Sequence, residues 1–522
     1  MNKINKGINL IKNMGIKKFL RSLNIYLFND FFNYQRWQIK RKLKKPSFSL
    51  SQKTVHIFII NDLKSPITKT INSIKKQNYP YIKTSVISKD LLSIDSLKED
   101  YCVFVNNGTI LEKDAISILI NEIKESSAIY SDHDKSGIIK NHAKFKPNFS
   151  IDLLRSYNYI DMAVMFKTSN LIDYHRSNIN DYVYENLLVL FENNKIINHV
   201  SDILFHLKKE AQLPSNEILN QHFKRLQLNV ETSTKNEFYY NYYIPSPQEG
   251  VSIIIPNKDH YEDLKLCIDS ILNHTKYILF EIIVVENNSE TKEIFEYYET
   301  LQKINNIKVV YWEGEFNYSA INNFGVRYAS YNYFLFLNND IEVRQNNWLS
   351  KLLGCISRQE VGIVGVKLLY PNHTIQHCGT IYGIWDIASH VFLDQKEDYI
   401  GYMKRTLVQQ NLSVVTAACM ISKRSVFEQV GGFDESLKVA FNDVDYCLKV
   451  RQLNYLVCLD PSVVLIHYES KSRGSDEISE EKRNRFKNEV NRMNEKWHEV
   501  ILKGDPYYNV NLTLDRTDFT IR

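Results

Sequence analysis

The sequence predicts an α/β fold made of two tandem units, each with a mainly parallel, Rossmann-like sheet, preceded by a basic helical arm. Three observations predict it. Short β-branched runs are bounded by polar turns, helical patterns follow these runs, and both recur in the same order later in the chain. Strands that alternate with helices favour a parallel sheet covered on both faces.

The repeat defines the two units. Each opens on a predicted strand, continues into a helical pattern, and later has a strand that ends in a polar turn. Because three blocks match in the same order, we interpret the units as copies of one α/β unit and not as a short-period solenoid. The matched pairs are 54–60 with 251–255, 70–80 with 267–277, and 101–108 with 333–340.

The predicted organisation has five parts, since 522 residues exceed one compact core. Pro245, Pro247 and Gly250 break regular structure and mark a linker, whereas residues 178–232 are predicted to be helical. The parts are a basic amphipathic helical arm at 1–50, a first unit at 51–235, the linker at 236–250, a second unit at 251–480, and a C-terminal helix and tail at 481–522.

The N-terminal arm carries the basic excess. Residues 1–45 contain twelve Lys or Arg and one acid, Asp30, although the whole chain has a net charge of only +5. Apolar residues at helical spacing make the arm amphipathic, so it can lie on an anionic inner-leaflet membrane surface. The alternative is a helix that packs on the protein itself. No nucleic-acid recognition motif follows the basic run, so we expect no nucleic-acid partner.

Cysteine spacing and hydropathy indicate the compartment. The seven Cys residues include no CxxC pair, which disfavours a disulfide framework or zinc site. No apolar run reaches about 18 residues, so no transmembrane helix or signal peptide is predicted. We therefore expect a cytoplasmic protein, peripheral at the cytoplasmic face of the plasma membrane if the arm binds there.

Polar side chains follow three predicted strands of the second unit. They occupy Pro256–Asp259, Glu286–Ser289 and Asn338–Glu342. Since ligands of parallel α/β sheets gather at the carboxyl ends of the strands, three such ends indicate a site for a polar ligand.

Asp340 carries the most information at these ends. A carboxylate flanked by carboxamides suits Mg²⁺ or Mn²⁺, which can bridge a diphosphate and offset leaving-group charge. The alternative is an ordinary Asn-Asn-Asp turn.

Two later features favour the metal interpretation. Asp443 and Asp445 open an apolar-periodic helix, where Asp443 is a candidate general base; the alternative is that both cap the helix. His467 ends a predicted strand, where it is either a metal ligand or a structural hydrogen-bonding residue.

Taken in order, these segments resemble the family 2 glycosyltransferases of the GT-A fold, across most of the second half of the chain. Two departures stand out: Asn338 occupies the first position of the DxD-type metal motif, and Asn442 the usual Glu of a Glu-Asp-x-Asp motif. The resembling segments are Ser252–Pro256, Val284–Ser289, Phe316–Gly325, Leu337–Glu342, Thr416–Met420, Gly431–Glu435, Asn442–Asp445 and His467–Ser470.

The resemblance implies roles for individual residues. It implies Asp340 and His467 as ligands of Mn²⁺ or Mg²⁺ and Asp443 as the catalytic base. Gln376–Gly379 and His390 are similar to a segment of relatives that build rhamnose-containing polysaccharides. The implied donor-binding residues are Pro256, Lys258, Asp259, Glu286, Asn287, Asn288, Asn317, Asn322, Asn338 and Asn339, and the implied acceptor-binding residues are His377, Gly379, His390, Ala418, Gly432 and Asp445.

The first unit resembles the same family less closely, in Ile129–Asp134 and Phe145–Ser150. Gly108 stands at its metal position and has no side-chain ligand, and no acidic turn follows the strand that ends at Ser88. We predict a catalytically degenerate GT-A-like unit, which either binds acceptor glycan or only supports its neighbour.

The implied function is inverting sugar transfer from a nucleotide-sugar donor to a growing, lipid-linked cell-surface polysaccharide. The implied donor is dTDP-rhamnose, with a UDP-hexose as the alternative. A non-catalytic carbohydrate-binding or scaffold protein of a polysaccharide assembly complex is the competing hypothesis. A nucleotidyltransferase is disfavoured because Pro256–Asp259 is not a Gly-rich phosphate loop.

Overall fold

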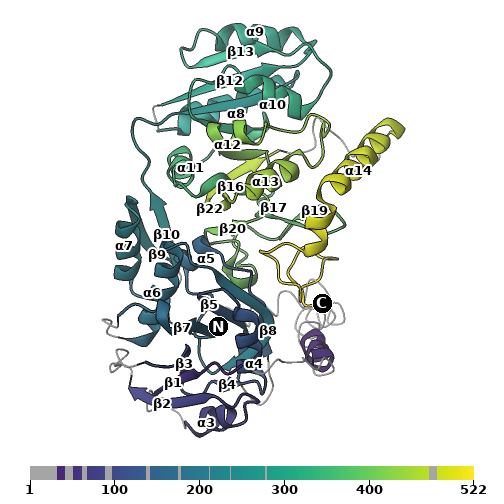
Figure 1. Ribbon diagram of the computed structural model, residues 1–522. Coiled ribbons are helices and arrows are strands. Elements are labelled where there is room, and N and C mark those ends of the chain that lie inside the picture. Colours follow the sequence, from purple (N-terminus) through teal and green to yellow (C-terminus); the bar gives the residue numbers. More distant parts are fainter. Residues whose placement is uncertain are drawn as a thin grey trace, which may run out of the picture.

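The computed structural model describes residues 32–41, 51–61, 67–88, 97–136, 141–173, 178–210, 212–235, 237–276, 279–468 and 479–522. Figure 1 shows the first sheet and its helices in the lower half and the second in the upper half. The predicted helical arm at 1–50 lies mostly outside the described residues, but residues 32–41 are helical.

The first unit contains a sheet in the order β2-β1-β3-β7-β5-β8-β4, with β6 paired to β5. Its elements are β1 (Val55–Asn61), α3 (Thr68–Lys75), β2 (Ile82–Ser88), β3 (Tyr101–Asn106), β4 (Ile110–Leu111), α4 (Ala115–Ile123), β5 (Ala128–Lys135), β6 (Asn141–Lys144), α5 (Ile151–Ser156), β7 (Val164–Lys167), η1 (Thr168–Asn170), α6 (Ile179–Glu192), β8 (Ile197–Leu207) and α7 (Asn216–Arg225).

The second unit contains a sheet in the order β13-β12-β11-β14-β21-β16-β22-β15, with β17 paired to β16 and β20 to β22. Its elements are β11 (Val251–Asn257), α8 (Tyr261–His274), β12 (Phe280–Glu286), α9 (Lys292–Leu301), β13 (Ile307–Tyr311), α10 (Tyr318–Val326), β14 (Tyr333–Leu337), β15 (Ile341–Glu342), α11 (Trp348–Ile356), β16 (Val361–Leu369), β17 (Ile375–His377), β18 (Thr380–Tyr382), β19 (Ala388–His390), η2 (Tyr402–Lys404), β20 (Gln410–Leu412), β21 (Cys419–Lys423), α12 (Arg424–Gln429), α13 (Asn442–Gln452) and β22 (Leu456–His467).

The two sheets repeat one pairing scheme. In the first, β1 pairs in parallel with β2 and β3, β7 is antiparallel to β3 and β5, and β8 is parallel to β5. In the second, β11, β14, β21, β16 and β22 follow the same scheme. Both sheets are therefore mixed and not mainly parallel, because antiparallel strands join the parallel strands that open each unit.

Buried apolar strands explain where the sheets form. β14 reads Tyr-Phe-Leu-Phe-Leu and every residue of it is buried, as expected for a central strand covered on both faces. One hydrophobic cluster runs from Phe104 and Tyr182 in the first unit to Ile253 and Leu335 in the second. The units thus share a core.

Two sequence expectations about the junction were wrong. Residues 178–232 are not all helical, because β8 lies between α6 and α7. The expected linker also contains a strand: β9 (Val230–Lys235) and β10 (Phe238–Tyr243) form an antiparallel hairpin. A Cβ atom on Gly354 of α11 would lie 1.7 Å from the carbonyl oxygen of Tyr243, so glycine permits this hairpin to pack on the second unit.

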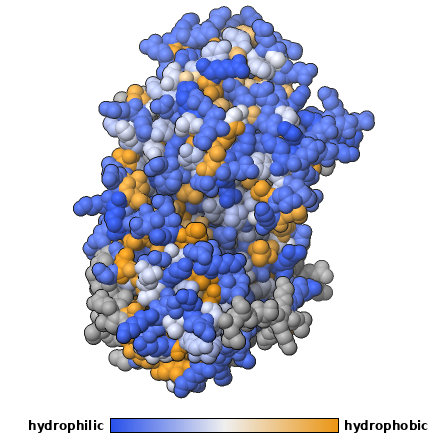
Figure 2. All heavy atoms as spheres, viewed as in Figure 1, coloured by the Kyte–Doolittle hydropathy of each residue, from blue (hydrophilic) through white to orange (hydrophobic). Residues whose placement is uncertain are grey.

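The C-terminal segment consists of helix α14 (Glu480–Lys503) and a tail that folds back onto both units. Phe519 stacks on Phe392 and Tyr402 of the second unit, and Asn509 donates to Asp132 of the first. The outer end of α14 projects from the molecule and its surface is hydrophilic (Figures 1 and 2). Within the described ranges, no helix has the length and apolar character that crossing a membrane requires.

Candidate active site

The carboxyl ends of β11, β12 and β14 form one hydrogen-bonded edge. The Asn339 carboxamide donates to Asn257 Oδ1 over 2.6 Å, and Asn257 Nδ2 donates to the Tyr298 hydroxyl over 2.7 Å. That hydroxyl donates to Glu286 Oε2, also over 2.7 Å. Parallel pairing of these strands brings the three ends together, as the strand-end pattern predicts.

Asp340 and His467 face each other at this edge. β15 pairs with β22 so that Ile341 lies opposite His467, which brings the preceding Asp340 to the end of β22. The distance from His467 Nε2 to Asp340 Oδ1 is 3.1 Å, and the distance to Asn338 Nδ2 is 3.2 Å. Asp340 Oδ1 is buried and accepts no hydrogen bond from any donor in the described part of the chain.

These residues fit a hard divalent cation. His467 Nδ1 lies 2.6 Å from Gln376 Oε1, so Nδ1 carries the proton and the Nε2 lone pair points toward the Asp340 carboxylate. An imidazole lone pair and a carboxylate oxygen that converge in this way are a donor set that a divalent cation can bind. Among the described residues, no group of three or more His, Cys, Asp or Glu could hold a metal ion, so a cation would take further ligands from phosphate and water.

Asp443 lies in the first turn of α13, beside the same edge. Its Oδ2 accepts from the backbone N–H of Ala417 over 3.3 Å, and its Oδ1 accepts from the N–H of Val444. Burial raises the pKa of Tyr318, and the carboxylates of Asp443 and Asp340 raise it further. The Tyr318 hydroxyl donates to the carbonyl of Ala417, whose N–H donates to Asp443. The carbonyl of the next residue, Ala418, accepts from the N–H of Asn338, so this segment connects the candidate base to the strand end that carries Asp340.

Most of the expected donor-binding residues hold the local structure of the site. Glu286 accepts from the N–H and hydroxyl of Ser289 as well as from Tyr298. Asn287 and Asn288 both donate to the carbonyl of Gly314, which connects the end of β12 to the loop between β13 and α10. Their side chains therefore shape a turn, and their direct contact with a nucleotide stays a prediction.

The turn after β11 has the same character. Asp259 Oδ1 accepts from the N–H groups of Glu290 and Thr291. Burial raises the pKa of Asp259, but these hydrogen bonds outweigh it and lower the pKa below its usual value. Lys258 next to it is exposed and Pro256 is half-buried.

Asn317 and Asn322 belong to α10. Asn317 is the N-cap residue of this helix, where it accepts from the N–H of Ala320 and donates to the carbonyl of Glu435. Asn322 is fully buried and donates to the carbonyl of Tyr318. The capping bonds account for Asn317, whereas the buried Oδ1 of Asn322 accepts no hydrogen bond among the described residues.

Asp445 does not face an acceptor, which corrects the sequence expectation. Its side chain is 0% exposed and contacts Lys496 Nζ at 2.5 Å, Trp497 Nε1 at 2.9 Å and Lys449 Nζ at 3.4 Å. Asp445 therefore anchors α14 to α13. Side chains two positions apart in an α-helix point in directions that differ by about 200°, so Asp443 and Asp445 point to opposite sides of α13.

The other expected acceptor-side residues are also mostly buried. His377 is 0% exposed, and burial lowers its pKa well below the usual range. It packs edge-on against the half-buried His390, so direct contact of His377 with an acceptor is not possible in this structure. Ala418 is buried and its carbonyl accepts from the N–H of Asn338.

Gly379 and Gly432 are required by backbone geometry. Their φ angles are +107° and +66°, in the region that favours glycine. A Cβ on Gly379 would lie 2.5 Å from Leu412 Cδ1, and one on Gly432 would lie 2.7 Å from Asn323 Oδ1.

The corresponding edge of the first unit is covered by the protein itself. Gly108 occupies the place of Asp340, and His206 near the end of β8 bonds to Asp134 and to Glu112, the latter over 2.7 Å. The helix at 32–41 packs here: the Tyr34 hydroxyl donates to Asp134, and Arg41 pairs with Asp202 and Glu112. In these residues the arm packs on its own protein, which is the alternative that the sequence left open.

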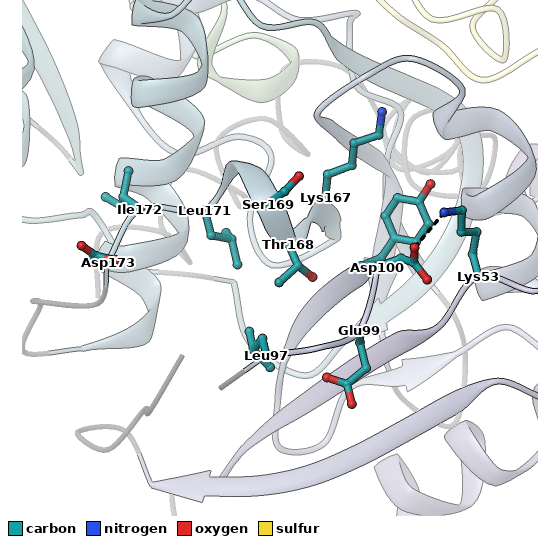
Figure 3. A pocket seen from close by; sticks show the side chains of 11 residues that line it. Lys53, Leu97, Glu99, Asp100, Lys167, Thr168, Ser169, Leu171, Ile172 and Asp173 are labelled. Atoms are coloured by element: carbon teal, nitrogen blue, oxygen red, sulfur yellow. Dashed lines mark hydrogen bonds and ion pairs between the residues drawn. The ribbon is translucent and has the colours of Figure 1, made fainter. Parts of the chain in front are cut away.

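A separate surface pocket lies at the opposite end of the first sheet (Figure 3). Its lining includes Lys53, Asp100 and Lys167, and Lys53 Nζ pairs with Asp100 Oδ1 at 2.8 Å. These residues stand at the start of β1, the start of β3 and the end of the antiparallel β7, far in sequence from the candidate site. The lining of this pocket contains carboxylates but no histidine.

Comparison with known proteins identifies the second unit. Residues 252–431 match the family described as glycosyl transferase family 2. The uncharacterized protein y4gI of Sinorhizobium fredii is 33% identical over 82% of this chain and 50% of its own length. The O-antigen biosynthesis protein RfbC of Myxococcus xanthus is 33% identical over 72% of this chain and 30% of its own. The chain thus spans half or less of these relatives.

A shorter match concerns an enzyme of known chemistry. The N-acetylglucosaminyl-diphospho-decaprenol L-rhamnosyltransferase of Mycobacterium tuberculosis is 34% identical over 65 residues, which cover 12% of this chain and 21% of that one.

Proposed function

We propose, from the premise that residues 252–431 belong to glycosyl transferase family 2, that the protein transfers a sugar from a nucleotide-sugar donor to a glycan hydroxyl with inversion. One observation carries the proposal: Asp340 faces His467 at 3.1 Å, and the segment Ala417–Ala418 bonds both to Asp443 and to the strand end at Asn338. The site therefore combines groups that suit a cation with a carboxylate that suits a proton.

Each residue has a part in the proposed mechanism. Asp443 accepts the proton of the acceptor hydroxyl, whose oxygen forms a bond to the anomeric carbon as the bond to the nucleoside diphosphate breaks on the opposite face. Asp340 and His467 are the residues that would hold Mn²⁺ or Mg²⁺. When bound, that cation supplies charge neutralisation for the leaving group.

The proposed donor is dTDP-rhamnose, with a UDP-hexose as the alternative, and the proposed acceptor is a growing, lipid-linked surface polysaccharide. The names of two relatives support this choice, since one acts in O-antigen biosynthesis and the other is a rhamnosyltransferase. We further propose that the protein works at the cytoplasmic face of the membrane. Within the described part of the arm, at 32–41, Tyr34 and Arg41 bind the first unit.

We propose that the first unit is a diverged GT-A-like copy that supports the active one. The shared strand order of the two sheets supports common origin. Gly108 in place of Asp340, together with the helix packed over Asp134, supports the loss of catalysis.

Substitution of Asp443 tests the mechanism. We expect Asp443→Asn to lower turnover roughly 10²- to 10⁴-fold, because general base catalysis typically contributes that much. Nucleotide release is measured with Mn²⁺, acceptor glycan and a panel of dTDP- and UDP-sugars, and EDTA is expected to abolish it. The control is Asp398→Asn, an exposed aspartate outside the site. Full activity in Asp443→Asn contradicts the mechanism, and release from no donor favours the non-catalytic carbohydrate-binding alternative.

A further inference from the structure

Gln376 lies directly behind the proposed metal ligand His467. It is the central residue of β17, which pairs antiparallel with β16, and its side chain is 2% exposed. Its Oε1 atom lies 2.6 Å from His467 Nδ1, a short hydrogen bond between two buried side chains. Nothing in the proposed mechanism so far uses this contact.

The bond determines which ring nitrogen of His467 holds the proton. An amide oxygen only accepts, so the partner nitrogen Nδ1 must donate. In the neutral ring Nε2 then has a lone pair, which accepts the hydrogen bond from Asn338 Nδ2. That lone pair points to the side of the ring where Asp340 Oδ1 and Asn338 Nδ2 lie, at 3.1 and 3.2 Å.

Without the Gln376 acceptor, the His467 ring can adopt the other neutral tautomer. Nε2 would carry the proton and donate it to the Asp340 carboxylate, which at 3.1 Å is within hydrogen-bonding distance. Such a bond would occupy both proposed ligand atoms with each other and leave neither lone pair for a cation. The choice between the two arrangements therefore decides whether the site is ready for a metal.

We infer that Gln376 is a positioning residue that fixes the tautomer and the ring orientation of His467, so that the Nε2 lone pair and the Asp340 carboxylate both face the proposed cation position. The inference rests on the proposed function, because it assumes that His467 and Asp340 are the metal ligands. Gln376 itself touches neither the cation nor the sugar.

Two substitutions distinguish the role of Gln376 as a hydrogen-bond acceptor from its role in packing. Gln376→Leu fills nearly the same space but cannot accept, whereas Gln376→Glu keeps an acceptor oxygen at the same position. We expect Gln376→Leu to weaken Mn²⁺ binding about 10- to 100-fold, the usual effect of losing such a supporting bond. We expect Gln376→Glu to bind Mn²⁺ at least as tightly as the unmodified protein, because a carboxylate makes the imidazole a stronger ligand.

The probe is Mn²⁺ alone, titrated into the full-length protein, with free Mn²⁺ followed by electron paramagnetic resonance. Gln395→Leu, a substitution of the half-buried glutamine in the loop after β19, is the matched control and should leave Mn²⁺ affinity unchanged. Equal Mn²⁺ affinity in Gln376→Leu and the unmodified protein overturns the inference while the proposed function stands. Absence of Mn²⁺ binding to the unmodified protein overturns the proposed metal site and this inference together.

A second measurement does not depend on whether a Gln376 variant folds. In metal-free protein labelled with ¹⁵N-histidine, the His467 ring should show a protonated Nδ1 and an unprotonated Nε2, with the signal identified by its loss in His467→Asn. A ring protonated at Nε2 instead overturns the inference.

Discussion

Asp443 and Asp445 are two carboxylates of one helix with different surroundings. Asp443 is half-buried and accepts only backbone N–H groups among its described contacts, so it keeps access to a ligand. Asp445 is fully buried between Lys449, Lys496 and Trp497. Its charge is matched inside the protein and is not available for chemistry.

Asp445→Ala is therefore expected to lower the stability of the protein. We expect no direct effect of this substitution on sugar transfer. Lys449 and Lys496 are partly exposed and Lys496 also pairs with Asp434, so the expected loss is that of charged hydrogen bonds, about 1.5–3 kcal/mol. The thermal unfolding temperature should fall and α14 should become more accessible to proteases. Asp398→Ala, at an exposed position, is the control. An unchanged unfolding temperature in Asp445→Ala would contradict the anchoring role.

Sequence reasoning located the strand ends of the second unit but could not assign their side chains. The repeat of Tyr101–Gly108 in Tyr333–Asp340 was enough to place β3 and β14. It could not show that Glu286 uses its oxygens on Ser289 and Tyr298, because that depends on a turn and on a helix packed above it. Gln376 was visible as part of a motif, but its bond to a residue 91 positions away was not.

At the scale of elements, the helix at 32–41 is part of the first unit and not a free arm. Tyr34 is 2% exposed, and its ring lies near Trp37 and Phe145. Trp37 Nε1 donates to Asn511 Oδ1 in the C-terminal tail over 2.8 Å. The basic composition of the arm did not predict these contacts of Tyr34 and Trp37, because charge patterning describes the solvent-exposed face of a helix and not its buried face.

Tyr34→Ala should detach this helix. Loss of a fully buried aromatic side chain typically destabilises by about 3–5 kcal/mol. Hydrogen exchange of the amides at 32–41 should rise in Tyr34→Ala, and it should stay low in Phe32→Ala, since Phe32 is 58% exposed on the same helix. Equal protection in both variants would show that Tyr34 does not hold the helix in place.

β8 shows why one strand escaped prediction. Ile197–Leu207 places polar residues such as Asn198, His199 and Ser201 among its apolar ones, and its first half is largely half-buried. The strand is specified by its partners on β5 and β4, which are far away in the sequence. Local periodicity carries too little of this information to separate the strand from the helices on either side.

At the scale of the whole molecule, a buried ion-pair network joins the two units. Asp152 of α5 receives both Nη atoms of Arg358, at 2.5 and 3.2 Å, and the carboxamide of Asn411 at 2.6 Å. Burial raises the pKa of Asp152, but Arg358 and Arg155 outweigh it and hold the pKa well below the usual range. The units are thus locked by charge as well as by their shared core.

A double-mutant cycle tests this lock. Asp152→Leu leaves Arg358 buried without its partner, so we expect a loss of about 3–5 kcal/mol, and the double variant Asp152→Leu/Arg358→Met should be less destabilised than Asp152→Leu alone. Because the folded pKa of Asp152 is depressed, its contribution is full above the unfolded value of about 3.9 and is lost as pH falls below it. Additive effects in urea unfolding would contradict the coupling.

The tail that reaches back to the first unit bears on the order of events during synthesis. Asp132 of β5 accepts two hydrogen bonds from Asn509, which lies 377 positions further along the chain. The N–H of Asn148 donates to the carbonyl of Pro506 over 2.7 Å. A ribosome that adds about 5–20 residues per second needs tens of seconds to cover that separation. During this time the first unit lacks the hydrogen bonds that Asn509 and Pro506 supply. It therefore completes its fold only after the second unit has been made.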